Sequence, residues 1–118
     1  MSNQILQGKR VLVTHADAFM GPVLCEVFAN HGATVIPSCD TLMSADAPVA
    51  IVAEAGHVDI LVANLAILAP TTAATEVSDD EWNDTFAALV LPLQRLFRAV
   101  LPFMIERRSG KILVMGSA

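Results

Sequence analysis

The chain has 118 residues, of which 54% are hydrophobic and 16% are charged, and its formal net charge is −5. This length suits one domain built around one core, and the apolar composition excludes a disordered chain. The acidic balance, with a pI near 4.9, and the lack of a basic run argue against nucleic acid or an anionic membrane as a partner.

Neither a secretory signal nor a membrane span is predicted. The first eight residues lack the apolar stretch that a signal needs. The longest apolar helical pattern, Phe86–Ile105, is interrupted by Gln94, Arg95 and Arg98, which a lipid-facing helix tolerates poorly.

The cysteines and histidines do not form a metal-ligand pattern. Cys25 and Cys39 have neither CxxC nor metal spacing, and His15, His31 and His57 fall on three different predicted elements. We therefore expect a reduced, cytoplasmic protein without a metal site.

Short runs of β-branched residues alternate with helical patterns along the whole chain. In chain order, they predict a strand at 11–14, a helix at 21–31, a strand at 33–36, a helix at 46–55, a strand at 58–63, a helix at 79–107 and a strand at 111–115.

The helix predicted at 79–107 is the longest element. Ser78 and Glu81 form a capping-box pattern, in which Ser78 accepts from first-turn amides while Glu81 reaches back. Apolar residues cover two sides of this helix, so we expect it to pack on its own sheet and on a second body, such as a partner subunit. Pro92 and Pro102 are expected to kink it.

This alternation predicts a parallel sheet with right-handed crossovers. The fold class is α/β, a Rossmann-like doubly wound parallel sheet in three αβα layers, with residues 1–118 in a single domain. The last predicted strand ends three residues before the chain does, and only part of its helical cover is present. We therefore expect a truncated sheet of about four strands, the N-terminal part of a larger domain.

Four segments resemble the short-chain dehydrogenase/reductase superfamily in the right order, and together they cover nearly the whole chain: 11–21, 58–67, 81–107 and 110–118. The most specific pieces are VDILVAN at 58–64, RAVLPFM at 98–104 and GKILVMGS at 110–117. The resemblance implies a homodimer or homotetramer, which the two-sided helix at 79–107 favours independently.

The family's glycine-rich turn has the form TGxxxGxG, and its glycines let the backbone approach a pyrophosphate at a helix N-terminus. Thr14 and Gly21 match this pattern, but His15 and Phe19 stand where glycines belong. Two side chains are thus expected in the space that a dinucleotide needs.

The halohydrin dehalogenases resemble the same superfamily in fold, use no nicotinamide, and carry a T-x4-(F/Y)-x-G turn. Thr14, Phe19 and Gly21 fit that pattern without a gap. The resemblance implies that Phe19 lines a halide pocket. The alternative is that Phe19 is a core residue under the first helix.

Two further residues are candidates for ligand contacts. Asp40 lies slightly late for the acidic residue that holds the ribose in dinucleotide-binding units, and it is alternatively a turn or cap aspartate. Asn64 is retained from the family's NNAG motif and either stabilises the turn after its strand or contacts ligand. Between Cys39 and Val58 there is space for one helix, where the family usually has helix, strand and helix.

Ser117 aligns with the family's catalytic serine, at the carboxyl end of the fourth predicted strand, and the resemblance implies that it orients the substrate oxygen. Alternatively it is an ordinary strand-end serine. The family's Tyr and Lys or Arg follow this serine, and the chain contains no tyrosine. The 118 residues alone are therefore expected to be inactive.

Three hypotheses for function remain. The leading one is a halohydrin dehalogenase-like parent that converts a vicinal haloalcohol to an epoxide and halide without a cofactor. The second is an NAD(P)-dependent short-chain oxidoreductase with a degenerate glycine turn. The third is an inactive fragment that acts only through its interface helix. Expected partners are a small-molecule substrate, a halide ion in the first case, and further copies of the chain.

Overall fold

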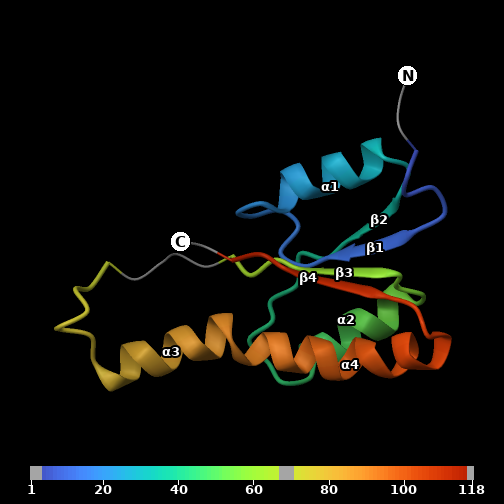
Figure 1. Ribbon diagram of the computed structural model, residues 1–118. Coiled ribbons are helices and arrows are strands. Elements are labelled where there is room, and N and C mark those ends of the chain that lie inside the picture. The colour runs from blue at the N-terminus through green and yellow to red at the C-terminus, as the bar shows by residue number, and fades with distance from the viewer. Residues whose placement is uncertain (1–3, 67–70, 117–118) are drawn as a thin grey trace.

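A computed structural model describes residues 4–66 and 71–116 of the chain. Four parallel strands form one sheet: β1 (Arg10–Val13), β2 (Thr34–Pro37), β3 (Ile60–Ala63) and β4 (Lys111–Val114). Their order across the sheet is β2-β1-β3-β4 (Figure 1). The full Rossmann sheet has the strand order 3-2-1-4-5-6. The four strands here correspond to its strands 2, 1, 4 and 5, in that order across the sheet. The predicted α/β, Rossmann-like fold with about four strands is confirmed.

Helices cover both faces of this sheet. Helix α1 (Gly21–Asn30) lies on one face, and α2 (Ala47–Ala55) and α4 (Leu91–Arg107) lie together on the other (Figure 1). The apolar residues divide accordingly into two clusters. The α1 cluster is centred on Val11, Val13, Ala16, Ile60 and Val62. The α2–α4 cluster includes Leu12, Leu61, Ile51, Leu96, Val100 and Met104. The strands alternate between the clusters, as both-sided burial of a parallel sheet requires.

The crossover from β2 to α2 is short. Residues 38–46 connect them with no strand of their own, so the predicted single helix between Cys39 and Val58 is confirmed. Within the described residues, β2 pairs only with β1. In the full Rossmann sheet, the third strand pairs with the other edge of this strand.

The helix predicted at 79–107 is present, but it divides into two helices just before Pro92, where the sequence predicted a kink. Helix α3 (Asp79–Leu89) ends at Val90, whose φ of −113° departs from the helical value while its ψ of −51° does not, and α4 begins with Pro92 in its first turn. The proline lacks the N–H that would continue the hydrogen-bond ladder, and its ring suits a helix start. Pro102 lies inside α4, which continues through it to Arg107.

Only half of the predicted capping box forms. The Ser78 hydroxyl accepts from the Glu81 N–H at 3.1 Å, as predicted. The Glu81 carboxylate instead accepts from the Thr72 hydroxyl at 2.6 Å. The acid therefore ties α3 to the preceding loop, and not to its own N-cap.

Helices α3 and α4 leave much apolar surface uncovered. The rings of Trp82 and Phe86 lie 5.3 Å apart on α3 and are 59% and 43% exposed. By length and composition, Asp79–Arg107 is the one segment of the described residues that could cross a membrane. However, its helix breaks at Val90, and α4 is packed against α2 and β3. Its buried face is therefore explained by the core of this domain.

Candidate functional site

Three polar residues directly follow strand ends at the carboxyl edge of the sheet: Thr14 after β1, Ser38 after β2 and Asn64 after β3. Open parallel α/β sheets place their ligands at this edge. Thr14 and Asn64 are fully buried. The candidate site therefore starts from these strand ends and from the turn between β1 and α1.

Asn64 holds that turn in place. Its Nδ2 donates to the carbonyl oxygens of His15 and Ala18, both at 3.0 Å. Its backbone N–H donates to the Thr14 hydroxyl at 3.0 Å, and this hydroxyl donates to the Asn64 carbonyl at 2.8 Å. These four hydrogen bonds hold the turn after β1, whereas the sequence suggested a role for Asn64 in the turn after its own strand, β3. Its Oδ1 is buried and has no partner.

The backbone of the turn is left-handed at the two positions where the glycine pattern is broken. His15 has a φ of +44° and Phe19 a φ of +53°. Non-glycine residues adopt this region only at a cost of roughly 1–2 kcal/mol each. A Cβ on Gly21 would lie 2.5 Å from the backbone of His15 and Ala16. The turn therefore keeps a backbone that favours glycine at all three positions. At His15 and Phe19 the reason is the positive φ, and at Gly21 it is the lack of space for a Cβ.

The ring of His15 is turned toward the segment after β3. Its Nδ1 accepts from the backbone N–H of Ala66 at 2.7 Å, which requires this nitrogen to be unprotonated. Burial lowers the pKa of His15 below its ordinary value, and the nearby Asp17 only partly opposes this. His15 thus joins the turn to the β3 end as a neutral side chain. No pattern in the sequence indicated this role.

Phe19 is 55% exposed, so its interpretation as a core residue under α1 is wrong. Helix α1 begins directly after it, with Met20 as N-cap, no side-chain cap and no acidic residue in its first turn. The Gly21 N–H donates to the Ala18 carbonyl at 2.8 Å and the Leu24 N–H to the Met20 carbonyl at 2.9 Å. Pro22 has no N–H, so the Val23 N–H is the first-turn donor that remains for a ligand at the positive end of the helix dipole. Phe19 and the α1 N-terminus adjoin one another at the carboxyl edge.

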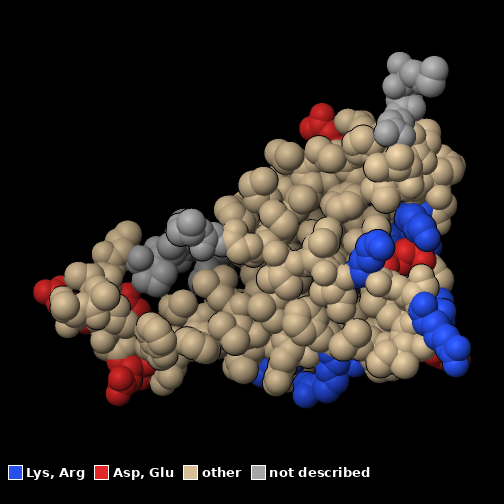
Figure 2. Space-filling view, in the orientation of Figure 1, with Lys and Arg blue, Asp and Glu red and all other residues tan. Residues whose placement is uncertain are grey.

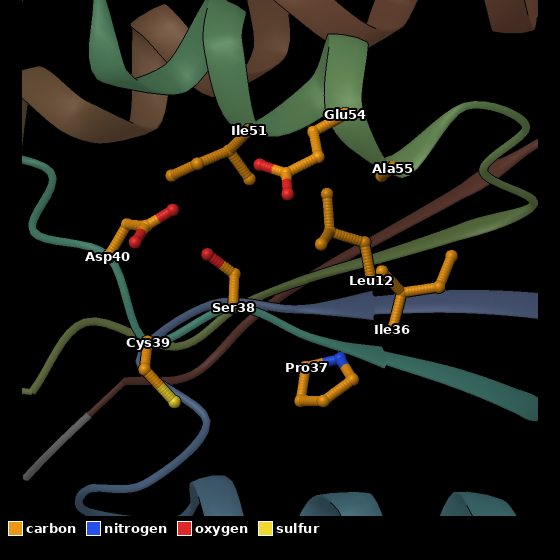
Figure 3. Close-up of a pocket in the computed structure, with 9 residues that line it drawn as sticks. All are labelled: Leu12, Ile36, Pro37, Ser38, Cys39, Asp40, Ile51, Glu54 and Ala55. Atoms are coloured by element: carbon orange, nitrogen blue, oxygen red, sulfur yellow. The ribbon is translucent and has the colours of Figure 1, made fainter.

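Asp40 lies apart from this turn. It lines a cavity of about 350 Å³ between the end of β2 and helix α2, together with Ser38 and Glu54 (Figure 3). The sequence could not indicate Glu54, because its place beside Asp40 depends on how α2 packs under the sheet. Ser117 lies outside the described residues.

The seven Lys and Arg residues lie away from the carboxyl edge: Lys9, Arg10, Arg95, Arg98, Arg107, Arg108 and Lys111. In Figure 2 most of them gather at the amino ends of the strands and on α4. Arg10 donates there to the His57 and Ala55 carbonyls, and Arg107 to that of Val58. The described residues therefore offer no cationic side chain beside Thr14, Asn64 or Asp40. They also contain no group of three potential metal-ligating side chains.

The family model for short chain dehydrogenases matches residues 38–118. The chain belongs to the short-chain dehydrogenase family. The matched residues begin just after β2, so the family assignment rests on the second half of the sheet and not on the unusual turn at 14–21.

Curated members of the short-chain dehydrogenase family match almost all of this chain. The 3-oxoacyl-(acyl-carrier-protein) reductases of Vibrio harveyi and Escherichia coli are 30% and 31% identical over 95% and 94% of it. A short chain dehydrogenase of Pseudocercospora fijiensis is 34% identical over 95%. The chain spans about half the length of these relatives, 46–56%. The alignments run over 136–142 positions, more than the 118 residues here, so the relatives carry extra residues within the aligned region.

Solved structures of the short-chain dehydrogenase type share this fold. A structure titled as a dehalogenation enzyme superposes with a TM-score of 0.85 and 26% identity, over 97% of this chain and 56% of that one. A 3-oxoacyl-(acyl-carrier protein) reductase with bound NAD from Brucella melitensis has a TM-score of 0.85 and 20% identity, over 98% and 56%. At that identity, the second likeness concerns the fold alone.

Proposed function

We propose that this chain is the dinucleotide-binding half of an NAD(P)-dependent oxidoreductase of the short-chain dehydrogenase family. The observation that carries this proposal is the left-handed backbone at His15 and Phe19. Strained backbone persists where the surrounding structure enforces it, and it concentrates at ligand sites. Here the strain preserves the path of a glycine-rich turn in front of the uncapped N-terminus of α1.

The arrangement of the turn fits a pyrophosphate better than the sequence suggested. The His15 ring is bonded to Ala66, so it is directed at the β3 end. The Phe19 ring is exposed, so it can rotate without opening the core. The Val23 N–H and the positive end of α1 would hold the pyrophosphate oxygens, and Asp40 would accept from a ribose hydroxyl once its loop orients it. The bound nicotinamide would supply or accept the hydride, and Ser117 would hold the substrate oxygen.

The relatives favour this function over a cofactor-free one. The curated proteins at 30–31% identity are reductases, which supports the oxidoreductase hypothesis better than the dehalogenase hypothesis that led the sequence analysis. Their names state that they reduce 3-oxoacyl groups on acyl-carrier protein. We propose a substrate of this kind only for the longer protein of which this chain is a part.

A second candidate, dehalogenation of vicinal haloalcohols, is supported by one specific observation. Phe19 stands at the aromatic position of the T-x4-(F/Y)-x-G turn, with its side chain exposed beside the α1 N-terminus. The similarity to a dehalogenation enzyme structure agrees with it. In this alternative the Val23 N–H and the positive end of α1 would bind halide.

Paired titrations of the 118-residue chain separate the two candidates. NADH fluorescence is followed on adding protein, and bromide binding is followed by NMR with chloride and sulfate as ionic-strength controls. Saturable NADH binding supports the oxidoreductase. Saturable bromide binding without NADH binding supports the dehalogenase. Binding of neither, with self-association retained, supports a scaffold role.

We further propose that the parent is a homodimer or homotetramer in the cytoplasm and that α3 and α4 form its interface. The support is the exposed apolar surface of these helices, where Trp82, Phe86, Phe103 and Ile105 are 59%, 43%, 52% and 70% exposed. Trp82 and Phe86 pack on each other on α3, and Phe103 and Ile105 lie near the end of α4; exposed apolar groups of this size often mark protein–protein contacts.

A further inference from the structure

The turn after β1 and the residues after β3 meet where the winding of the sheet changes sides. Strands β1 and β3 are neighbours in the sheet. The chain leaves β1 toward α1 on one face, and it continues from β3 to α4 on the other face (Figure 1). Open α/β sheets bind their ligands at the carboxyl ends of two such strands. A contact that joins these two strand ends therefore lies where a ligand is expected.

His15 makes such a contact from the turn after β1. Its Nδ1 accepts from the N–H of Ala66, just after β3, at 2.7 Å. A second bond runs in the opposite direction, because the Nδ2 of Asn64 donates to the His15 carbonyl at 3.0 Å. His15 is thus bonded to the residues after β3 through both its ring and its backbone.

The bond to Ala66 needs a neutral imidazole. A lone pair on Nδ1 has to face the Ala66 N–H, so the ring carries its one proton on Nε2. Burial lowers the pKa of His15, and Asp17 on the same turn opposes this less strongly. The residues after β3 that the structure describes, 64–66, are uncharged. The ring therefore acts as a hydrogen-bond acceptor and not as a cation.

This bond exists only because position 15 is not a glycine. The backbone of His15 has a φ of +44°, a conformation that a glycine adopts without strain. A glycine would leave the Ala66 N–H without the ring nitrogen that now accepts from it. Strained backbone of this kind persists where the surrounding structure enforces it, and it concentrates at ligand sites. The strain at His15 accompanies a bond that a glycine could not make.

We propose that His15 is a positioning residue for the dinucleotide, and that its bond to Ala66 holds the residues after β3 against the turn before the ligand arrives. Groups that are already ordered lose less conformational freedom on binding, which strengthens the affinity. The proposal rests on the dinucleotide function proposed above. It adds to that function a side chain at a position where the family's turn pattern has glycine.

Two variants separate the bond from the mere presence of a side chain. In His15→Asn, the amide Oδ1 is attached to Cγ, as Nδ1 is in histidine, so it can accept from the Ala66 N–H. Asparagine also tolerates a left-handed backbone. His15→Gly fits the backbone without strain but offers no acceptor. Circular dichroism of both variants checks that they are folded.

The bond itself is tested without a ligand, by hydrogen exchange at the Ala66 amide of the ¹⁵N-labelled chain. Exchange should be equally slow in the unmodified chain and in His15→Asn. In His15→Gly it should be several-fold faster, up to about tenfold, as the loss of one hydrogen bond implies. Lowering the pH below the ordinary pKa of histidine should shift the Ala66 resonance in the unmodified chain and leave it unchanged in His15→Asn.

The effect on the ligand is tested by NADH titration of the three proteins at a pH where histidine is neutral. His15→Asn should match the unmodified chain, and His15→Gly should bind several-fold more weakly. Equal or tighter NADH binding by His15→Gly, or equally fast Ala66 exchange in all three proteins, would overturn the proposal. If the unmodified chain does not bind NADH, the dinucleotide function and the positioning role both fail, while slow Ala66 exchange would still establish the bond from His15.

Discussion

Thr14 and Asn64, fifty residues apart in the chain, exchange two hydrogen bonds at the carboxyl ends of β1 and β3. The Thr14 hydroxyl donates to the Asn64 carbonyl at 2.8 Å and accepts from the Asn64 N–H at 3.0 Å. Because the Asn64 side chain also bonds the carbonyls of His15 and Ala18, this pair couples the second half of the sheet to the turn before α1. The shape of the turn thus depends on β3.

Replacing the Asn64 side chain should loosen the turn. Asn64→Ala removes two part-buried hydrogen bonds, while the His15 and Ala18 carbonyls each keep a bond from a backbone N–H of the turn. At roughly 0.5–1.5 kcal/mol per lost bond, we expect a loss of about 1–3 kcal/mol in the free energy of unfolding. Urea unfolding followed by circular dichroism measures it. Asn83→Ala, at an exposed position on α3, is the control and should not destabilise the protein. An Asn64 variant as stable as the control would contradict the role given to this residue.

The stability of the chain should fall as the pH decreases below about 6.5, the ordinary pKa of histidine. The pKa of His15 is lowered in the folded protein, so between the folded and the unfolded pKa the unfolded chain binds more protons. Unfolding is then favoured as the pH decreases through this window, and the effect levels off below the folded pKa. Protonation would also end the bond from the Ala66 N–H to Nδ1.

His15→Asn isolates this effect, because asparagine tolerates a left-handed backbone and does not titrate. Thermal unfolding from pH 5 to pH 8 should show a smaller slope for the variant than for the unmodified chain. Identical slopes for the two proteins would show that His15 does not cause the pH dependence.

Phe19→Gly should relieve backbone strain and improve dinucleotide binding. A left-handed φ suits glycine, so the variant should gain roughly 1 kcal/mol in stability, and its affinity for NADH should rise. Met20→Gly, at a neighbouring position with a right-handed φ of −85°, should bring neither gain. If Phe19→Gly instead abolishes bromide binding and leaves NADH unbound, the dehalogenase alternative is correct.

A charge on α3 should prevent self-association. Phe86→Glu places a carboxylate in the apolar surface around Trp82, and we expect the dissociation constant of the oligomer to rise at least about tenfold, or 1.4 kcal/mol. Analytical ultracentrifugation measures it, with Val23→Glu on the exposed side of α1 as control. Equal dissociation constants for the two variants would show that the interface lies elsewhere on the protein.

The fold could be predicted because each strand and helix is encoded locally. The β-branched run at 58–63 and the Ser78 cap each indicate one element, and the alternation of elements determines the parallel sheet. A kink at Pro92 was predicted, but a full division into two helices was not, because the apolar periodicity continues across Val90 and does not show whether a proline bends a helix or starts a new one.

The candidate site was predictable only in part. The family resemblance placed Thr14, Phe19 and Gly21 in one turn and Asn64 at the end of another strand, and the structure brings Asn64 to that turn. The sequence could not show that the backbone at His15 and Phe19 is left-handed. That conformation depends on hydrogen bonds from Asn64, which is nearly fifty residues away in the chain. The joint position of Asp40 and Glu54 likewise depends on tertiary packing.

We propose that the turn at 14–21 and the N-terminus of α1 hold a dinucleotide pyrophosphate. An NMR titration of the ¹⁵N-labelled chain with NADH, followed at the amides of residues 15–24, tests this proposal. We expect saturable shifts centred on Val23, with smaller ones at Gly21 and Leu24. NADPH should bind more weakly, because no cationic side chain in the described parts of the chain lies near Asp40 to bind a 2′-phosphate. Unchanged amides in this segment at saturating NADH, with shifts on adding bromide, would contradict it.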